Sequence, residues 1–230
     1  MATISLCMIV KNESAVLARC LDSIADLMDE IIIVDTGSTD NTKEIAAQYT
    51  SRIYDFKWTS DFSAARNFSF SKATMEYIYT ADADEILDDA NRERFLRLKG
   101  ALLPEIEIVQ MKYVTQGTFD TVLNAKKEYR PKLFRRLRTF TWIDPIHETV
   151  RLTPVTFDSD VEILHCPQSL HSKRDFSIFI KAFEHDGQFS PKIRTMYAKE
   201  LLKTGDKKDF TDAKPIFQLI FKSSLADRKS

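Results

Sequence analysis

The stretch ISLCMIVKNESAVLARCLDSIADLMDEIIIVD, residues 4–35, decides the fold that the sequence predicts. Its first seven residues, 4–10, form an apolar block bounded by polar residues, which is typical of a strand covered on both faces. Apolar side chains then recur every three or four positions, which predicts an amphipathic helix that Asn12 or Ser14 would cap. A second buried strand follows at residues 31–34. The stretch is therefore a β-α-β unit, which joins two parallel strands.

The same alternation continues to residue 84. A polar loop leads to a helix over about 42–49, a strand at 52–56, a helix over about 60–72 and a strand at 76–82. A β-α-β-α-β-α-β order predicts a right-handed, doubly wound α/β sheet. Such sheets bind ligands at the carboxyl ends of their strands.

The rest of the chain changes character twice. Residues from about 105 to 166 are mainly strand-like with irregular connections, and from His171 onward the pattern is helical. We place a boundary near residue 168, between an α/β domain at 1–168 and a helical segment at 169–230. Within that segment YAKELLKTGDKKDFTDAKPIF resembles about one tetratricopeptide repeat, and fewer than three repeats rarely stand alone. Whether the chain is full length stays open.

Composition narrows the class of protein. A chain of 230 residues with 43% hydrophobic and 29% charged side chains can form one substantial domain plus a small appendage. The net charge of -1 gives no reason to expect nucleic acid or an anionic membrane as a general partner. Three widely spaced cysteines predict buried thiols in a reducing compartment. No apolar run approaches the roughly 20 residues of a spanning helix, so we predict a soluble, cytoplasmic protein.

Polar residues gather where three of the predicted strands end. They are Lys11 to Glu13, Asp35 to Asp40, and Asp82 to Glu85. Because the carboxyl ends of parallel strands share one edge of a sheet, these loops predict a ligand site there.

Two of these loops suggest specific chemistry. Asp82 and Asp84 lie two residues apart and could direct hard oxygen ligands to a divalent cation that bridges a diphosphate, or to a ribose. The alternative is that these acids and Glu85 form the acidic start of the next helix. In VDTGSTDNT, Asp35 closes the strand and Gly37 permits a tight turn, so the carboxylate could accept from a nucleotide's ring N–H or sugar hydroxyl. The alternative there is a capping loop without a ligand.

Four ordered motifs, ISLCMIVKNE, DEIIIVDTGSTDNT, DFSAARNFSFSKA and DADEIL, closely resemble family 2 glycosyltransferases with the GT-A fold. The resemblance covers about residues 3–168. It is specific to bacterial members with tetratricopeptide repeats after the catalytic domain, an architecture similar to that of the bacteriocin peptide S-glycosyltransferases. It implies a Rossmann-like mixed α/β sheet flanked by helices, followed by a short helical repeat-like segment.

The resemblance also implies roles for matching residues. Around the nucleotide and donor sugar of a UDP-sugar it places Val10, Lys11, Asn12, Glu13, Asp35, Gly37, Ser38, Asp61, Arg66, Asn67, Asp82 and Ala83. Within this set Asp35 would bind uracil and Asp82 the ribose. Asp84 would bind a divalent cation, and His165 would complete the metal shell. A histidine ligand favours Mn²⁺ over Mg²⁺.

The segment FTWIDPIHETVRL supplies candidates for the acceptor side. Trp142 could stack on a sugar face, and Asp144, His147 or Glu148 could be the general base. We favour Glu148, then Asp144. Related sequences have a glycine-containing turn where this chain has Asp144-Pro145.

A basic run, KKEYRPKLFRR, lies between these motifs at residues 126–136. It could clamp a diphosphate, receive an anionic lipid-linked or polysaccharide acceptor, or be a solvated strand surface. The residues alone leave these three roles open.

The sequence therefore predicts metal-dependent, inverting transfer of a sugar from a UDP-sugar to a glycan, a lipid-linked glycan, a protein or a peptide. One alternative is a non-catalytic nucleotide-sugar or protein-binding module. Another is a sugar-nucleotide nucleotidyltransferase, for which IVKNES lacks the expected glycine-rich loop. We expect no nucleic-acid partner. Peripheral contact with the inner face of the membrane and a homo-oligomer through the C-terminal helices stay open.

Overall fold

The computed structural model describes residues 1–115, 127–136, 142–143, 145–146, 148–150, 155–166 and 172–226. The first part of the chain forms β1 (Ile4–Val10), α1 (Leu17–Ile24), the 3-10 turn η1 (Ala25–Leu27), β2 (Glu30–Asp35), α2 (Thr42–Ala46), β3 (Ile53–Asp55), α3 (Phe62–Phe70) and β4 (Tyr77–Thr80). The second part forms β5 (Glu85–Ile86), α4 (Asp89–Ala101), β6 (Ile108–Thr115), β7 (Lys127–Arg135), β8 (Trp142–Ile143), β9 (Thr149–Val150), β10 (Thr156–His165), α5 (Ser172–Asp186), α6 (Pro191–Thr204) and α7 (Lys207–Ala226).

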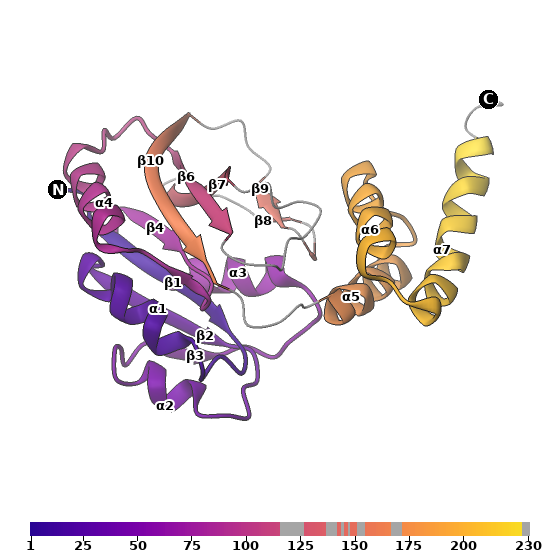
Figure 1. The fold of residues 1–230 in the computed structure, drawn as a ribbon, viewed down its shortest axis with the longest axis horizontal. Helices are drawn as coiled ribbons and strands as arrows, with labels where there is room; N and C mark the ends of the chain where they lie inside the picture. The colour runs from indigo at the N-terminus through magenta and orange to yellow at the C-terminus, as the bar shows by residue number, and fades with distance from the viewer. Residues whose placement is uncertain are drawn as a thin grey trace.

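An eight-stranded mixed sheet organises the first domain, in the order β3-β2-β1-β4-β7-β6-β10-β5. The first four strands in this order are parallel, which confirms the β-α-β alternation predicted from the sequence. Strand β7 is antiparallel to both β4 and β6, and the short β5 closes the far edge antiparallel to β10. The mixed α/β sheet that the sequence predicted is therefore confirmed (Figure 1).

Helices cover both faces of this sheet. Leu6 and Met8 of β1 pack in one core with α1 and α4, whereas Cys7, between them, packs in a second core with aromatic residues of α3. Side chains of a strand alternate between faces, so a strand buried on both sides must be apolar throughout. This explains the unbroken apolar run of β1, whose seven residues are all apolar except Ser5.

The structure corrects the predicted cap of the first helix and excludes the alternative in which the acidic motif starts a helix. Helix α1 begins at Leu17 after Val16, which provides no side-chain cap, so neither Asn12 nor Ser14 caps it. Helix α4 begins only at Asp89, and Asp88 is its cap. Asp82 and Asp84 therefore lie just before the short strand β5, Glu85 begins that strand, and none of the three starts a helix.

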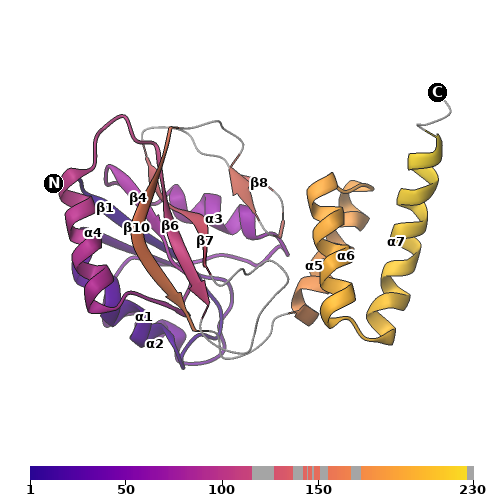
Figure 2. The same cartoon turned by 45° about the horizontal axis from the view of Figure 1, so that its top comes forward.

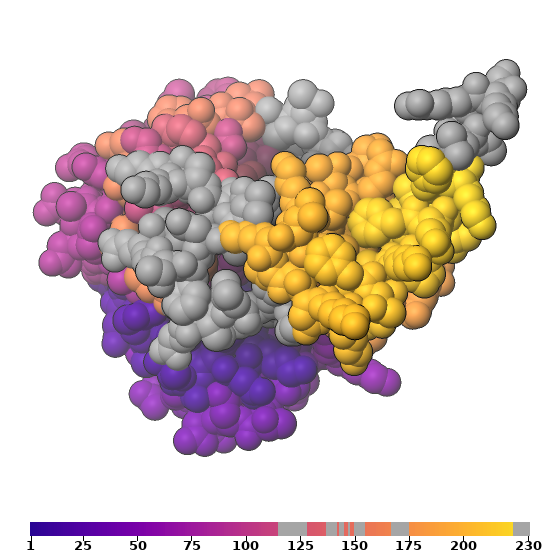
Figure 3. All heavy atoms as spheres, turned by 45° about the vertical axis from the view of Figure 1, so that its right-hand side comes forward, coloured from indigo at the N-terminus to yellow at the C-terminus, as the bar shows by residue number. Residues whose placement is uncertain are grey.

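Three helices, α5 to α7, form the C-terminal segment and confirm its predicted helical character. Their core contains Phe179 and Tyr197, whose rings stack with centroids 4.6 Å apart. Figure 2 shows these helices side by side beyond one end of the sheet domain, and in Figure 3 their orange and yellow atoms gather on one side of the molecule. The likeness to tetratricopeptide repeats and the boundary at residue 168 stay predictions. Within the described ranges, no helix combines the length and the apolar character needed to cross a membrane.

Candidate active site

The loops after β1 and β2 lie side by side at the carboxyl edge of the sheet. The parallel register pairs Val10 with Asp35, and the carbonyl of the buried Val10 accepts a hydrogen bond from the Thr36 N–H at 3.0 Å. Because the ends of β1 and β2 are neighbours, the loops that begin at Lys11 and at Asp35 lie together.

The two carboxylate oxygens of Asp35 have different surroundings. Its Oδ1 accepts hydrogen bonds from the N–H groups of Gly37 and Ser38, each at 2.9 Å. Gly37 has a φ of 102°, a conformation that favours glycine. Oδ2 is buried and has no hydrogen-bond partner in the part of the chain that the structure describes. Because a buried acceptor without a partner is costly, this oxygen fits a ligand that brings an N–H or O–H donor.

The loop after β1 is tied to the loop after β2 by side chains predicted to surround the nucleotide. The Asn12 N–H donates to Ser38 Oγ at 2.9 Å, and Asn12 Oδ1 accepts from the Thr39 N–H at 2.7 Å. The Glu13 N–H donates to Thr42 Oγ1 at 2.8 Å. These hydrogen bonds hold the two loops together. Lys11, which lies between β1 and Asn12 in the sequence, is exposed.

The acidic motif alternates between open and buried side chains. The Asp82 side chain is 53% exposed and that of Asp84 is 21% exposed, while Ala83 and Glu85 are buried. Desolvation raises the pKa of the Asp82 carboxyl, but the positive charges of Lys132 and Arg66 outweigh this effect and lower the pKa below its ordinary value. Burial raises the pKa of Glu85, although Lys132 opposes that shift.

The two predicted metal ligands lie together although they are 81 residues apart in sequence: His165 Nε2 is 3.0 Å from Asp84 Oδ2. The cause is the antiparallel pairing of β5 with β10, which sets His165 opposite Glu85. The Cys166 N–H also donates to the Asp84 carbonyl at 3.0 Å. The ring of Tyr113 packs 5.0 Å from the histidine ring, centroid to centroid, and helps to orient it.

These residues fit a divalent cation bound together with a diphosphate. Two neighbouring ligands of an octahedral ion, each at about 2.1 Å, are themselves about 3 Å apart, which matches the Asp84–His165 separation. No group of three or more acidic, histidine or cysteine ligands occurs among the residues described. The remaining positions would be filled by water and phosphate oxygens, as is usual for Mg²⁺-type sites.

Arg66 contacts both Asp82 of the acidic motif and Glu148, a predicted base. Its guanidinium group, in a side chain only 10% exposed, lies 2.7 Å from Glu148 and 3.8 Å from Asp82. Burial alone would lower the pKa of Arg66, but the charges of Glu148 and Asp82 raise it above its ordinary value. Arg66 is therefore a fixed positive charge between two carboxylates.

The other two residues predicted from DFSAARN make structural contacts. Asp61 caps α3 by accepting from the N–H groups of Ser63 and Ala64 at 2.8 and 3.2 Å. The Asn67 side chain pairs with the backbone of Trp142, donating to its carbonyl at 3.1 Å and accepting from its N–H at 2.9 Å. Asn67 thus ties α3 to the segment that carries Glu148.

The expectation that Trp142 stacks on a sugar is wrong. Its ring is buried between Phe70 and Phe134, with centroids 5.8 and 5.3 Å away, and Arg66 lies over its face at 5.1 Å. The face of the ring is therefore already covered by protein. Asp144 and His147, two of the candidate bases, lie outside the described residues.

Sequence reasoning missed the partner of Glu85. Lys132, from the basic run, forms a buried ion pair with it. A usable signal was present, because a strand was one reading of the basic run, and a proline within it, Pro131, indicates a bulge if that strand is central.

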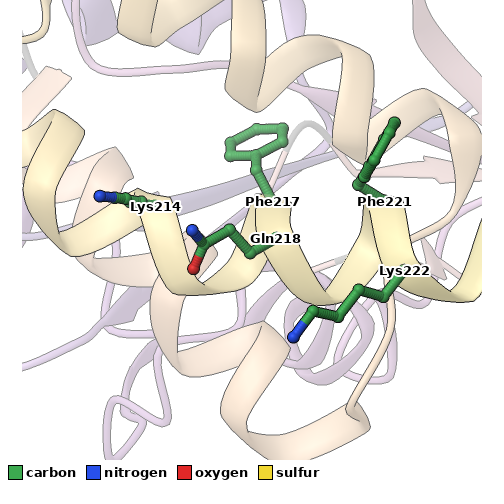
Figure 4. A pocket seen from close by; sticks show the side chains of 5 residues that line it. All are labelled: Lys214, Phe217, Gln218, Phe221 and Lys222. Atoms are coloured by element: carbon green, nitrogen blue, oxygen red, sulfur yellow. The ribbon is translucent and has the colours of Figure 1, made fainter.

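A groove elsewhere does not belong to this site. It lies on α7 and is lined by Lys214, Phe217, Gln218, Phe221 and Lys222 (Figure 4).

Comparison with solved structures defines the class of fold. The chain is similar to glucosyl-3-phosphoglycerate synthase from Mycobacterium tuberculosis, solved in complex with Mn²⁺, UDP-glucose and phosphoglyceric acid, with a TM-score of 0.56 and 17% identity over 83% of this chain and 82% of that one. The curled mixed sheet flanked by helices is thus the GT-A fold that the sequence predicted.

A family model, "Glycosyl transferase family 2", matches residues 5–153, and the chain belongs to this family. This confirms the resemblance carried by the four motifs. The glycosyltransferase SunS of Bacillus subtilis is 33% identical over 132 residues, which cover 56% of this chain and 31% of SunS. A TPR repeat-containing protein of Synechococcus elongatus is 48% identical over 87 residues, covering 38% of this chain and 22% of that protein. The matched region thus spans less than a third of these relatives' length.

Proposed function

We propose that the chain transfers a sugar from a UDP-sugar to an acceptor nucleophile, with a divalent cation held by Asp84 and His165. The observation that carries this proposal is the 3.0 Å approach of these two side chains, at the sheet edge where Asp35 keeps a buried oxygen without a partner among the described residues. A similar fold in the Mn²⁺ and UDP-glucose complex of the mycobacterial synthase supports the choice of ligands. The histidine ligand favours Mn²⁺ over Mg²⁺.

The donor would be held by its uridine and its diphosphate. Asp35 Oδ2 would accept the ring N–H of uracil, and Asp82 would accept from the ribose hydroxyls. When bound, the cation neutralises charge on the departing diphosphate. Arg66 adds a second positive charge near Asp82, which stabilises the same negative charge as it develops.

The acceptor would be activated by Glu148, with Asp144 and His147 as alternative bases. In an inverting single displacement the base removes the acceptor's proton, the acceptor atom forms its bond to the anomeric carbon, and UDP leaves with the bonding electron pair. Arg66 positions Glu148 through two N–H contacts to Oε1, at 2.7 and 3.2 Å. Ile146, two residues before Glu148, packs in the core of the helical segment, so this segment borders the acceptor side.

Calorimetric titration of UDP tests the donor site, carried out with Mn²⁺, with Mg²⁺ and with a chelator, on the wild type and on Asp84→Ala. We expect tight binding only with the metal, loss of that dependence in the variant, and hydrolysis of at least one UDP-sugar by the wild type. Metal-dependent binding without any turnover would favour a binding module. Absence of UDP binding in every condition would refute the proposed donor.

A further inference from the structure

Lys132 reaches the interior because β7 contains a bulge. The register with β6 pairs Leu133 with Val109 and then Pro131 with Gln110, so Lys132 is an extra residue in the ladder. Proline lacks the N–H that a central strand needs, and a bulge is the place where such a strand tolerates it. Bulges also redirect side chains. Lys132, at this bulge, is buried.

The Lys132 side chain contacts the acidic motif through Glu85. Lys132 Nζ forms an ion pair with Glu85 Oε1, and the two side chains are only 7% and 2% exposed. The other oxygen of Glu85 accepts a hydrogen bond from the Asp82 N–H at 3.3 Å. A single carboxylate therefore connects the lysine on β7 to the backbone of the first aspartate of the motif.

Burying two charges is a poor way to stabilise a fold. The desolvation of both ions offsets much of their attraction, and apolar residues of similar size are often as stable or more so. The Lys132–Glu85 pair, which is linked to the backbone of the acidic motif, is therefore better explained by a role in positioning that motif than by a contribution to stability. Lys132 is too buried to be part of a solvated strand surface or to grip a diphosphate itself, two of the roles that the basic run left open.

We propose that Lys132 is a positioning residue of the donor site, which acts through Glu85 to hold Asp82 and Asp84 in the arrangement that receives the cation and the diphosphate. This inference rests on the proposed function. Outer-shell partners of this kind typically change metal affinity or activity by about 10- to 100-fold when they are removed.

The test is a charge-free replacement of the pair, Lys132→Met with Glu85→Met. Both side chains stay unbranched and similar in length, and no unpaired buried charge remains, so we expect the protein to fold. We expect its affinity for UDP at saturating Mn²⁺ to fall by at least about tenfold. The double variant Lys132→Gln with Glu85→Gln restores an acceptor for the Asp82 N–H, and we expect it to recover part of the loss.

Lys99→Met is the matched control. Lys99 is an equally buried lysine, paired with Asp29 at 2.6 Å near the start of β1, at the opposite edge of the sheet from the site. This variant should lower the melting temperature and leave UDP affinity unchanged.

Wild-type affinity in the Met/Met variant would overturn the proposal, as would an equal loss in Lys99→Met. If Met/Met does not fold, the Gln/Gln variant decides, because wild-type affinity there, without the lysine charge, would also overturn it. A wild type that binds no UDP with metal would instead refute the proposed function, and this inference with it.

Discussion

Replacing Asp35 by asparagine should weaken nucleotide binding much more than it destabilises the fold. The carboxylate offers two acceptor oxygens: Oδ1 accepts hydrogen bonds from the N–H groups of Gly37 and Ser38, and Oδ2 has no donor among the residues that the structure describes. An amide offers one oxygen and one NH₂. If the amide oxygen stays on the loop, an NH₂ group meets the ligand's N–H, and if the amide flips, it meets the two backbone N–H groups. In either orientation the amide NH₂ group faces another N–H donor and cannot form a hydrogen bond with it.

The size of the effect follows from the contact that is lost. A hydrogen bond to a charged group contributes about 1.5–3 kcal/mol, and about 1.4 kcal/mol corresponds to a tenfold change in Kd. We therefore expect Asp35→Asn to raise the Kd for UDP by about 10- to 140-fold. The unfolding free energy should change less, because neutralising a buried carboxylate removes a desolvation cost that offsets the weaker loop hydrogen bonds.

Calorimetric titration of UDP at saturating Mn²⁺ measures this change, and thermal denaturation monitors the fold. Asp55→Asn is the matched control, because Asp55 is the register partner of Asp35 on β3 but is 77% exposed and paired with Lys43. The control should bind UDP as the wild type does. A folded Asp35→Asn variant with wild-type affinity would refute the role given to Asp35.

Three further predictions follow from the contacts of the site. Asp84→Asn should raise the apparent Kd for Mn²⁺ at saturating UDP by at least about tenfold, the scale on which even outer-shell changes act; unchanged Mn²⁺ affinity would contradict its role. Arg66→Lys should lower the kcat of sugar transfer about tenfold or more with little change in melting temperature, since lysine cannot make both contacts to Glu148 Oε1; wild-type turnover would argue against it. Partial burial raises the pKa of Asp40, but hydrogen bonds from Thr42 and Ser14 outweigh this effect and lower the pKa to about 2. A depressed pKa stabilises the fold above the unfolded value of 3.8, and this contribution is lost as pH falls toward about 2. Asp40→Asn should therefore flatten the dependence of the unfolding free energy on pH in that window, and an unchanged slope in denaturant titrations would count against this assignment.

Local sequence patterns were sufficient for the parallel half of the sheet. Strands β1, β2 and β4 each contain a short apolar run and α1 has a clear helical periodicity, so these elements can be predicted without distant information. The edge where Asp35 and Asp82 lie then follows from chain direction alone.

The rest of the site depends on pairings between distant residues. Asp84 meets His165 only because β5 pairs with β10, and nothing in a two-residue strand predicts its partner. The burial of Trp142 has the same origin, because it depends on Phe70 and Phe134 from other elements. Glu85 was grouped with Asp82 and Asp84 because all three are acidic, whereas the alternation of a strand-like segment already separates its side chain from theirs.

Arg66 makes the two halves of the site interdependent. Its one guanidinium group contacts both Asp82, the proposed ribose ligand, and Glu148, the proposed base, and it lies over the Trp142 ring. A diphosphate that binds near Asp82 adds negative charge on one side of this cation and so competes with Glu148 for it. Because residues that share one partner do not act additively, changes at Asp82 and Glu148 report on a single charge network. In the proposed function, donor binding and acceptor activation would thus be coupled through this one buried side chain.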